Sequence, residues 1–103
     1  MSDISTLTQK IITFCQERDW IKHHNAKDLA ISLSLESSEL LEHFQWKDNV
    51  QTNTHIQNNK EEIEDEMADV AIYLLQLAHF LDVDLSAAID NKMKKNAVKY
   101  PIE

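Results

Sequence analysis

Glycine is absent from this chain of 103 residues, and Pro101 is its only proline. Sheet proteins with tight hairpins normally need glycine where the backbone takes a positive φ, so this composition favours helices. The same absence excludes the glycine-rich phosphate loops of P-loop and dinucleotide-binding proteins. Any phosphate group must therefore be held by side chains or by a metal ion.

Cysteine, long apolar runs and positive charge are also scarce. A single Cys15 cannot form an internal disulfide, which fits a reducing cytoplasm, and its place beside an apolar stripe predicts a small buried side chain. We recognise no signal peptide and no run of transmembrane length, so we expect a cytoplasmic protein. The net charge of −8 argues against binding to a nucleic acid polymer or an anionic membrane.

Helical periodicity is what the chain does contain. Its length predicts a single domain over residues 1–103. The apolar spacing predicts four helices, over residues 3–17, 26–46, 60–81 and 85–98. We expect a loop over residues 19–25, a flexible polar loop over residues 47–58, and a helix cap at Asp84. The predicted fold class is therefore all-α, a four-helix bundle.

The helix expected over residues 60–81 predicts more than one subunit. Its second half, residues 70–78, is apolar nearly all round, and such a helix is covered on several sides. A domain of this size can scarcely supply that cover by itself. We therefore expect a homo-oligomer, at least a dimer, to complete the bundle.

Two acidic motifs are the most informative feature of the chain. Glu36 and Glu39 lie three residues apart on one expected helix, and Glu66 and Asp69 repeat that spacing on another, so each pair shares a helix face. Both pairs border apolar stripes, where ionised carboxylates are costly unless something compensates them. Either the motifs are solvated acidic faces, or they hold a divalent cation such as Mg²⁺, which prefers oxygen ligands. The residues alone leave both interpretations open.

Other polar and aromatic residues also have two interpretations. Lys92, Asn96 and Lys99 share one face of the last expected helix, which is either solvated or holds a polyphosphate. Trp20 and Trp46 lie near loop ends, where an aromatic side chain packs as a lid or stacks on a base. We expect His24 and His43 at the surface or the edge of the core rather than as metal ligands.

Two classes of protein compete with a metal-dependent enzyme. One is a non-catalytic helical module that binds metal or a partner and whose acids are otherwise surface charge. The other is a carboxylate di-iron bundle, which uses Glu-x-x-His motifs. None of the five histidines lies three residues after a glutamate, so the sequence disfavours the di-iron class.

Taken together, these residues resemble the all-α nucleoside triphosphate pyrophosphohydrolases of the MazG-like superfamily, and within it the dCTP pyrophosphatase subgroup. The resemblance runs from about Phe14 to Pro101. It is carried by the two acidic motifs and by four stretches, residues 17–20, 39–46, 66–74 and 96–101. After His24 the chain departs from the subgroup, which often has proline, a basic residue and asparagine where residues 26–28 are Ala-Lys-Asp.

The resemblance implies a magnesium-dependent enzyme that hydrolyses a (deoxy)nucleoside triphosphate, of the dCTP type, to the monophosphate and pyrophosphate. The implied Mg²⁺ ligands are Glu36, Glu39, Glu66 and Asp69. Glu39 is also our candidate catalytic residue, to orient or deprotonate the attacking water. The implied substrate-binding residues are Trp20, His24, Lys27, Trp46, Tyr73, Lys92, Asn96, Lys99 and Tyr100. The subgroup tends to form dimers of dimers, which implies a dimer or tetramer here.

Overall fold

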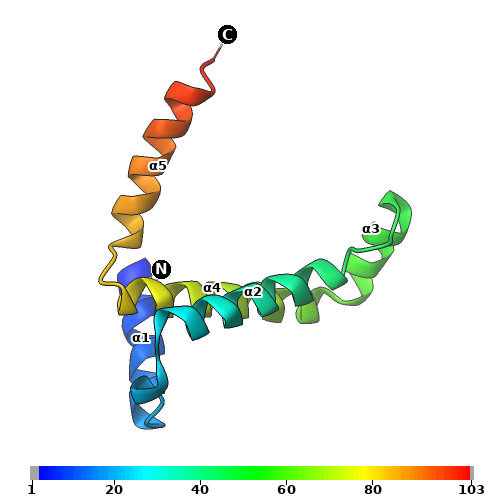
Figure 1. Ribbon diagram of the computed structural model, residues 1–103. Coiled ribbons are helices and arrows are strands. Elements are labelled where there is room, and N and C mark those ends of the chain that lie inside the picture. The colour runs from blue at the N-terminus through cyan, green and yellow to red at the C-terminus, as the bar shows by residue number, and fades with distance from the viewer. Residues whose placement is uncertain (1–2, 103) are drawn as a thin grey trace.

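The computed structural model describes residues 3–102, and its helices confirm the expected all-α class (Figure 1). No strand occurs among these residues. A short 3₁₀ helix, Ile21–His23, lies in the first loop. The five α-helices are α1 (Ile4–Glu17), α2 (Ala26–Glu42), α3 (Asn49–Asn58), α4 (Lys60–Phe80) and α5 (Leu85–Lys99).

Side-chain caps fix where most of these helices begin. The Asp3 carboxylate accepts a hydrogen bond from the Thr6 amide at the start of α1, and Asn25 starts α2 in the same way. Asp84 accepts from the Ala87 amide, so the cap predicted for α5 is confirmed. Each such bond satisfies a backbone N–H that has no partner inside the helix.

The expected flexible loop over residues 47–58 was wrong, because most of it forms α3. Asp48 and Gln51 make a reciprocal capping box, in which each side chain accepts from the other residue's backbone amide. This local arrangement favours a helix although the segment is rich in Asn, Gln and Thr, which we interpreted as loop residues. Its packing against α4 adds tertiary support.

The helix predicted over residues 26–46 ends earlier, at Glu42. The amides of His43 and Phe44 bond three residues back, to Leu40 and Leu41, which tightens the last turn. Trp46 then takes a φ of 68°, in the left-handed region that ends a right-handed helix. Residues 43–48 therefore form a turn that leads into α3.

The helices are arranged around one antiparallel pair. Figure 1 shows α2 and α4 side by side, with α1 across one end of the pair and α3 at the other. Beyond α4 the chain bends by 101°, and α5 leads away from the other helices. No single helix of the described chain is long and apolar enough to cross a membrane, and only α4 and α5 taken together pass the same test of length and composition.

The core of this single chain is small. Its buried apolar side chains are Ile12, Cys15, Leu29, Ile63, Leu75 and Ala78, so the expectation of a buried Cys15 is confirmed. None of the buried residues belongs to α5. The radius of gyration is 16.6 Å, whereas a compact domain of this length has about 13 Å. The chain by itself is therefore an open structure that leaves much apolar surface exposed.

Candidate metal and nucleotide site

Three of the four predicted metal ligands come together where α2 faces α4. Glu36 and Glu39 lie on one face of α2, and Glu66 lies on the adjoining face of α4. Each of the three offers a carboxylate oxygen, and these oxygens all lie within 4.8 Å of one another. Divalent cations of the Mg²⁺ and Ca²⁺ kind are bound by such oxygen sets.

The cluster contains buried oxygens that have no partner. Oε2 of Glu36 and Oε2 of Glu66 are both shielded from solvent, and neither has a hydrogen-bond partner among the described residues. Two carboxylate oxygens can bond to each other only when one carries a proton. A buried acceptor left in this state is costly, so the arrangement favours either a shared proton or a cation.

The electrostatics of the cluster favour the neutral acid when no cation is present. Burial, followed by the hydrogen bonds that the protonated acid can make to Glu66 and Glu39 and by the charges of Glu39 and Asp69, raises the pKa of Glu36 to about 7. Burial also raises the pKa of Glu66. Hydrogen bonding to Glu36 acts in the opposite direction, whereas Glu39 and the charge of Asp69 act in the same direction as burial. A divalent cation would oppose these effects because it stabilises the ionised form.

Asp69, the fourth predicted ligand, lies about one turn of α4 beyond Glu66 and outside the group of three oxygens. It lines an apolar cavity of about 690 Å³ between α1 and α4. Trp20 and Tyr73, two of the predicted nucleotide-binding residues, line the same cavity. Phe14 supports one wall, since its ring meets Trp20 edge to face with centroids 5.8 Å apart. The structure therefore places an aromatic cavity beside the acids.

A second cavity, of about 420 Å³, lies on the side of the cluster toward α3. Glu39 and Glu66 line it together with Glu42, His43 and His55. Glu42 and His55 were not among the residues predicted near the site. His55 was missed because its segment was expected to be a flexible loop, and His43 was expected only at the surface or the core edge.

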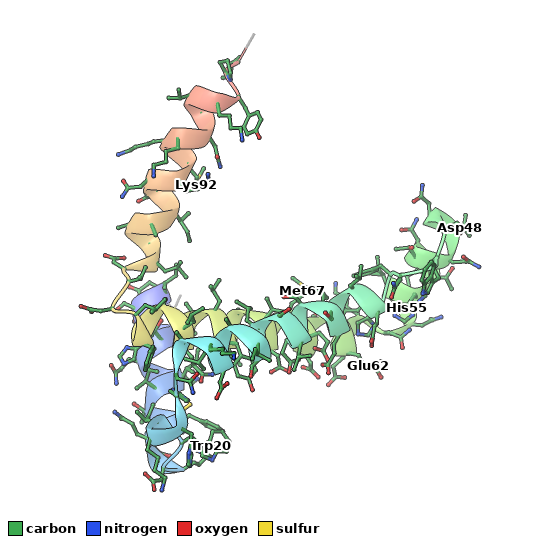
Figure 2. The ribbon with its side chains drawn as sticks, viewed as in Figure 1. Trp20, Asp48, His55, Glu62, Met67 and Lys92 are labelled. Carbon is green, nitrogen blue, oxygen red and sulfur yellow. The ribbon has the colours of Figure 1, made fainter. Side chains whose placement is uncertain are left out.

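The remaining predicted binding residues lie away from the acids. Lys92, Asn96, Lys99 and Tyr100 belong to α5 or its end, and Figure 2 shows Lys92 on that separate arm. Trp46 is 92% exposed on the turn after α2. His24 is half-buried just before α2, with its pKa lowered first by burial, and Lys27 is exposed in the first turn of α2.

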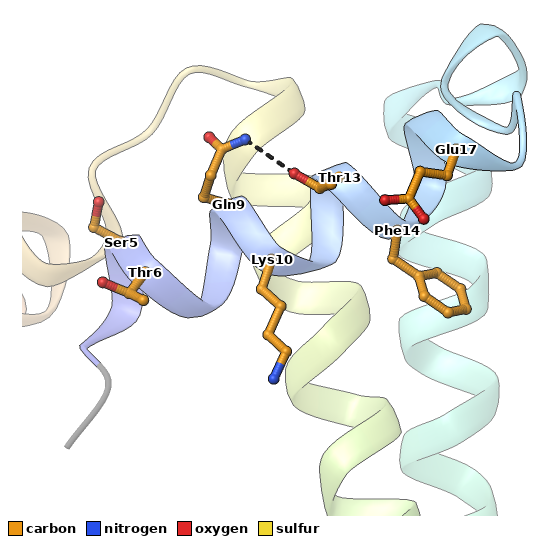
Figure 3. Close-up of a pocket in the computed structure, with 7 residues that line it drawn as sticks. All are labelled: Ser5, Thr6, Gln9, Lys10, Thr13, Phe14 and Glu17. Atoms are coloured by element: carbon orange, nitrogen blue, oxygen red, sulfur yellow. Dashed lines mark hydrogen bonds between the residues drawn. The ribbon is translucent and has the colours of Figure 1, made fainter.

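Another cavity, of about 630 Å³, opens on the face of α1 and is shown in Figure 3. All seven of its lining residues lie on this one helix, and Gln9 donates a hydrogen bond to Thr13 across it. It contains none of the predicted site residues. Among the predicted site residues, the structure thus brings together the clustered acids and the aromatic residues of the neighbouring cavity, with the histidine-lined cavity beside them.

Residues 31–103 match the MazG-like family. dCTP pyrophosphatase 1 of Rattus norvegicus is 38% identical over 91 residues, which are 86% of this chain and 54% of the relative. The Homo sapiens protein of the same name is 38% identical over 90 residues, 85% of this chain and 53% of its own length. The chain therefore spans about half the length of the curated relatives that it matches.

A solved structure extends the likeness to nearly the whole fold. The crystal structure of a pyrophosphatase from Archaeoglobus fulgidus DSM 4304 superposes with a TM-score of 0.91 and 38% sequence identity. The match covers 99% of this chain and 95% of the archaeal chain. The chain belongs to the MazG-like family, which confirms the resemblance that its motifs and matching stretches indicated.

Proposed function

We propose that this protein is a nucleoside triphosphate pyrophosphohydrolase, which cleaves a nucleotide of the dCTP type to the monophosphate and pyrophosphate with the help of Mg²⁺. The observation that carries the proposal is the three-carboxylate cluster between α2 and α4. Relatives named dCTP pyrophosphatase 1 and a likeness to a solved pyrophosphatase support the reaction and the choice of base.

The residues present fit a divalent cation. Glu36 and Glu66 each hold a buried oxygen without a partner, and the oxygen of Glu39 completes the set. Carboxylate oxygens suit Mg²⁺ and Mn²⁺ better than softer ions. When bound, such an ion neutralises phosphate oxygens and lowers the pKa of a bound water.

Glu39 is the acid best placed to act on the attacking water. Of the three clustered carboxylates it is the exposed one, whereas Glu36 and Glu66 are half-buried. Its oxygens can therefore contact solvent while still lying at the cluster. A carboxylate in this position can orient a water molecule and accept its proton, which is the role of a general base.

The aromatic cavity is the proposed place for the base and sugar. Trp20 and Tyr73 line it, and Asp69 lies at the same cavity, one turn of α4 from the clustered Glu66. Concave apolar cavities with a few polar groups are the usual form of small-molecule sites. Stacking on the aromatic walls would hold the base while the acids face the phosphates.

We include a second copy of the chain in this proposal, as a homodimer or a dimer of dimers. The helix α5 has no buried residue, and it carries exposed apolar side chains at Ile89, Met93 and Val98. The same helix holds the basic residues predicted to bind phosphate, Lys92 and Lys99. A partner subunit would cover the apolar side chains of α5 and bring these lysines opposite a cluster of acids.

The test is a panel of nucleoside triphosphates, incubated with the protein and Mg²⁺ and analysed for every phosphorus-containing product. We expect monophosphate and pyrophosphate in equal amounts, with dCTP among the best substrates. Orthophosphate with a nucleoside diphosphate would contradict the reaction type. Equal rates on all bases would contradict only the dCTP preference.

A further inference from the structure

A chain of hydrogen bonds joins the end of α2 to α3 and α4. His43 Nδ1 lies 2.8 Å from His55 Nε2, and both rings are partly buried. The other ring nitrogen of His55, Nδ1, lies 3.1 Å from Nδ2 of Asn59. Figure 2 shows His55 near α3, at the end of the α2–α4 pair opposite α1. Both histidines line the 420 Å³ cavity that also contains Glu39 and Glu66.

One backbone carbonyl shows which atoms donate and which accept along these hydrogen bonds. The side-chain nitrogen of Asn59, Nδ2, lies 3.0 Å from the backbone carbonyl oxygen of His55. Because a carbonyl oxygen can only accept, the NH₂ group of Asn59 must be the donor. The same amide group therefore donates to Nδ1 of His55. That leaves the proton of neutral His55 on Nε2, which donates to Nδ1 of His43. Neutral His43 must then carry its own proton on Nε2.

The surroundings favour the neutral form of His55. A proton added to Nδ1 of His55 would face the Asn59 donor. Burial first, then the charges of Lys47 and His43, lowers the pKa of His55, while Glu62 acts in the opposite direction. The acids that share the cavity are Glu39, Glu42 and Glu66. No hydrogen bond among the described residues involves Nε2 of His43.

We propose that His43 binds the substrate's phosphates, its Nε2–H donating a hydrogen bond to a phosphate oxygen in the cavity that it shares with Glu39 and Glu66. This inference rests on the proposed function, because the metal-binding acids are what would bring phosphates there. His55 and Asn59 are positioning residues that fix the His43 tautomer. A neutral donor suits this place, since a lysine would pair with the acids instead of the phosphates.

The first experiment determines the imidazole tautomers of His43 and His55 in the wild-type protein. Long-range ¹H–¹⁵N spectra of the imidazoles should show protonated Nε2 on both His43 and His55. Addition of Mg²⁺ and then pyrophosphate should move the His43 Nε2 signal at the pyrophosphate step, while the exposed His79 stays unchanged. An Nδ1–H tautomer on His55, or no response of His43 to pyrophosphate, would overturn the inference.

The second experiment compares variants. His43→Leu should lower kcat/KM by about tenfold or more, the effect of losing one donor to a charged group. His43→Gln, which keeps an N–H, should recover part of that loss, and His79→Gln is the matched control. His55→Leu should lower kcat/KM less, and the double variant should be no worse than His43→Leu alone, because both act through one donor.

The two proposals fail in different ways. If the wild type cleaves nucleotides but His43→Leu keeps full kcat/KM, the proposed function stands and the role of His43 is refuted. Additive losses in the double variant would refute the positioning role of His55. If no nucleotide is cleaved but pyrophosphate still shifts the His43 signal, phosphate binding stands and the proposed function fails.

Discussion

The α2–α4 pair and α5 both carry residues predicted to bind metal or substrate. In the single chain, the residues of the pair cluster together, whereas those of α5 lie on a helix with no buried residue. In the pair, side chains 30 residues apart in the chain, Glu36 and Glu66, lie within 4.8 Å of each other. On α5, Lys92 and Lys99 lie on a helix without a single buried residue. One half of the proposed site is thus assembled within a chain, and the other half is not.

The reason for this difference is the apolar surface available to each region. The helices α2 and α4 pack together and bury Leu29 and Ile63, and α1, which buries Ile12, packs against α4. The exposed side chains of α5, such as Met93 at 64%, have no such neighbour. In our proposal, the metal-binding half therefore depends on the fold of one chain, and the phosphate-binding half depends on association with a second chain.

The largest expected effect comes from disrupting the acidic cluster between α2 and α4, the half of the proposed site that a single chain forms. Glu66→Gln keeps the shape of the side chain but removes the carboxylate that we propose as a cation ligand. We expect turnover to fall by about a hundredfold or more, which corresponds to about 2.7 kcal/mol of transition-state stabilisation. Steady-state assays with Mg²⁺ measure it, and Glu64→Gln on the exposed face of α4 is the control. Full activity in Glu66→Gln would refute the site.

A mixing experiment tests the half that depends on assembly. A Lys92→Ala/Lys99→Ala variant should be nearly inactive, as should Glu66→Gln. If each site combines the acids of one subunit with α5 of its partner, random mixed dimers should restore about a quarter of the wild-type sites. Activity after co-refolding measures it. A mixture no more active than its components, or a mass near 12.0 kDa by light scattering, would show that α5 does not act across subunits.

Trp46 belongs to neither region, because it lies on the turn between α2 and α3, and it therefore gives a third point of comparison. It is 92% exposed in the single chain, so removing it should cost the fold little. If it stacks on the base in the assembled enzyme, Trp46→Ala should weaken binding by about 1–3 kcal/mol and raise KM more than it lowers kcat. Val50→Ala, at a nearby exposed position on α3, is the control. An unchanged KM would exclude a stacking role.

The smallest expected effect concerns stability and pH. The pKa of Glu36 is raised to about 7 by burial and by its neighbours, so its contribution to stability is complete below the ordinary value of 4.5 and is lost as the pH rises through about 7. Thermal melts in EDTA should therefore show a lower melting temperature at pH 8 than at pH 5. Glu36→Gln should reduce this difference, whereas Glu64→Gln should not.

Magnesium should reverse that loss, because an ion that binds only the native state stabilises it by mass action. A rise in melting temperature at pH 8 with millimolar Mg²⁺, absent from Glu36→Gln, is the expected result. Melts that do not respond to the metal, together with no heat of binding in calorimetry, would remove the metal site from the proposal.

Local sequence signals predicted the helices well where capping and periodicity agreed. Asp84 caps α5 as expected, and α4 follows its predicted range almost to the residue. The same signals failed at residues 47–58, because Asn, Gln and Thr are common both in loops and at helix ends. The capping box of Asp48 and Gln51 decided between the two, and it was overlooked in a segment without apolar periodicity.

The sequence by itself determined the all-α class and the pairing of acids on each helix face, since these follow from composition and a period of 3.6 residues. It also determined the family, through the resemblance of its motifs to those of known members. Only the tertiary structure decided that Glu36, Glu39 and Glu66 form the cluster while Asp69 lies at the neighbouring cavity. It also placed His55 beside His43. Such contacts depend on how two helices pack and on where a turn directs the following helix. The residue spacing within one segment predicts neither of these.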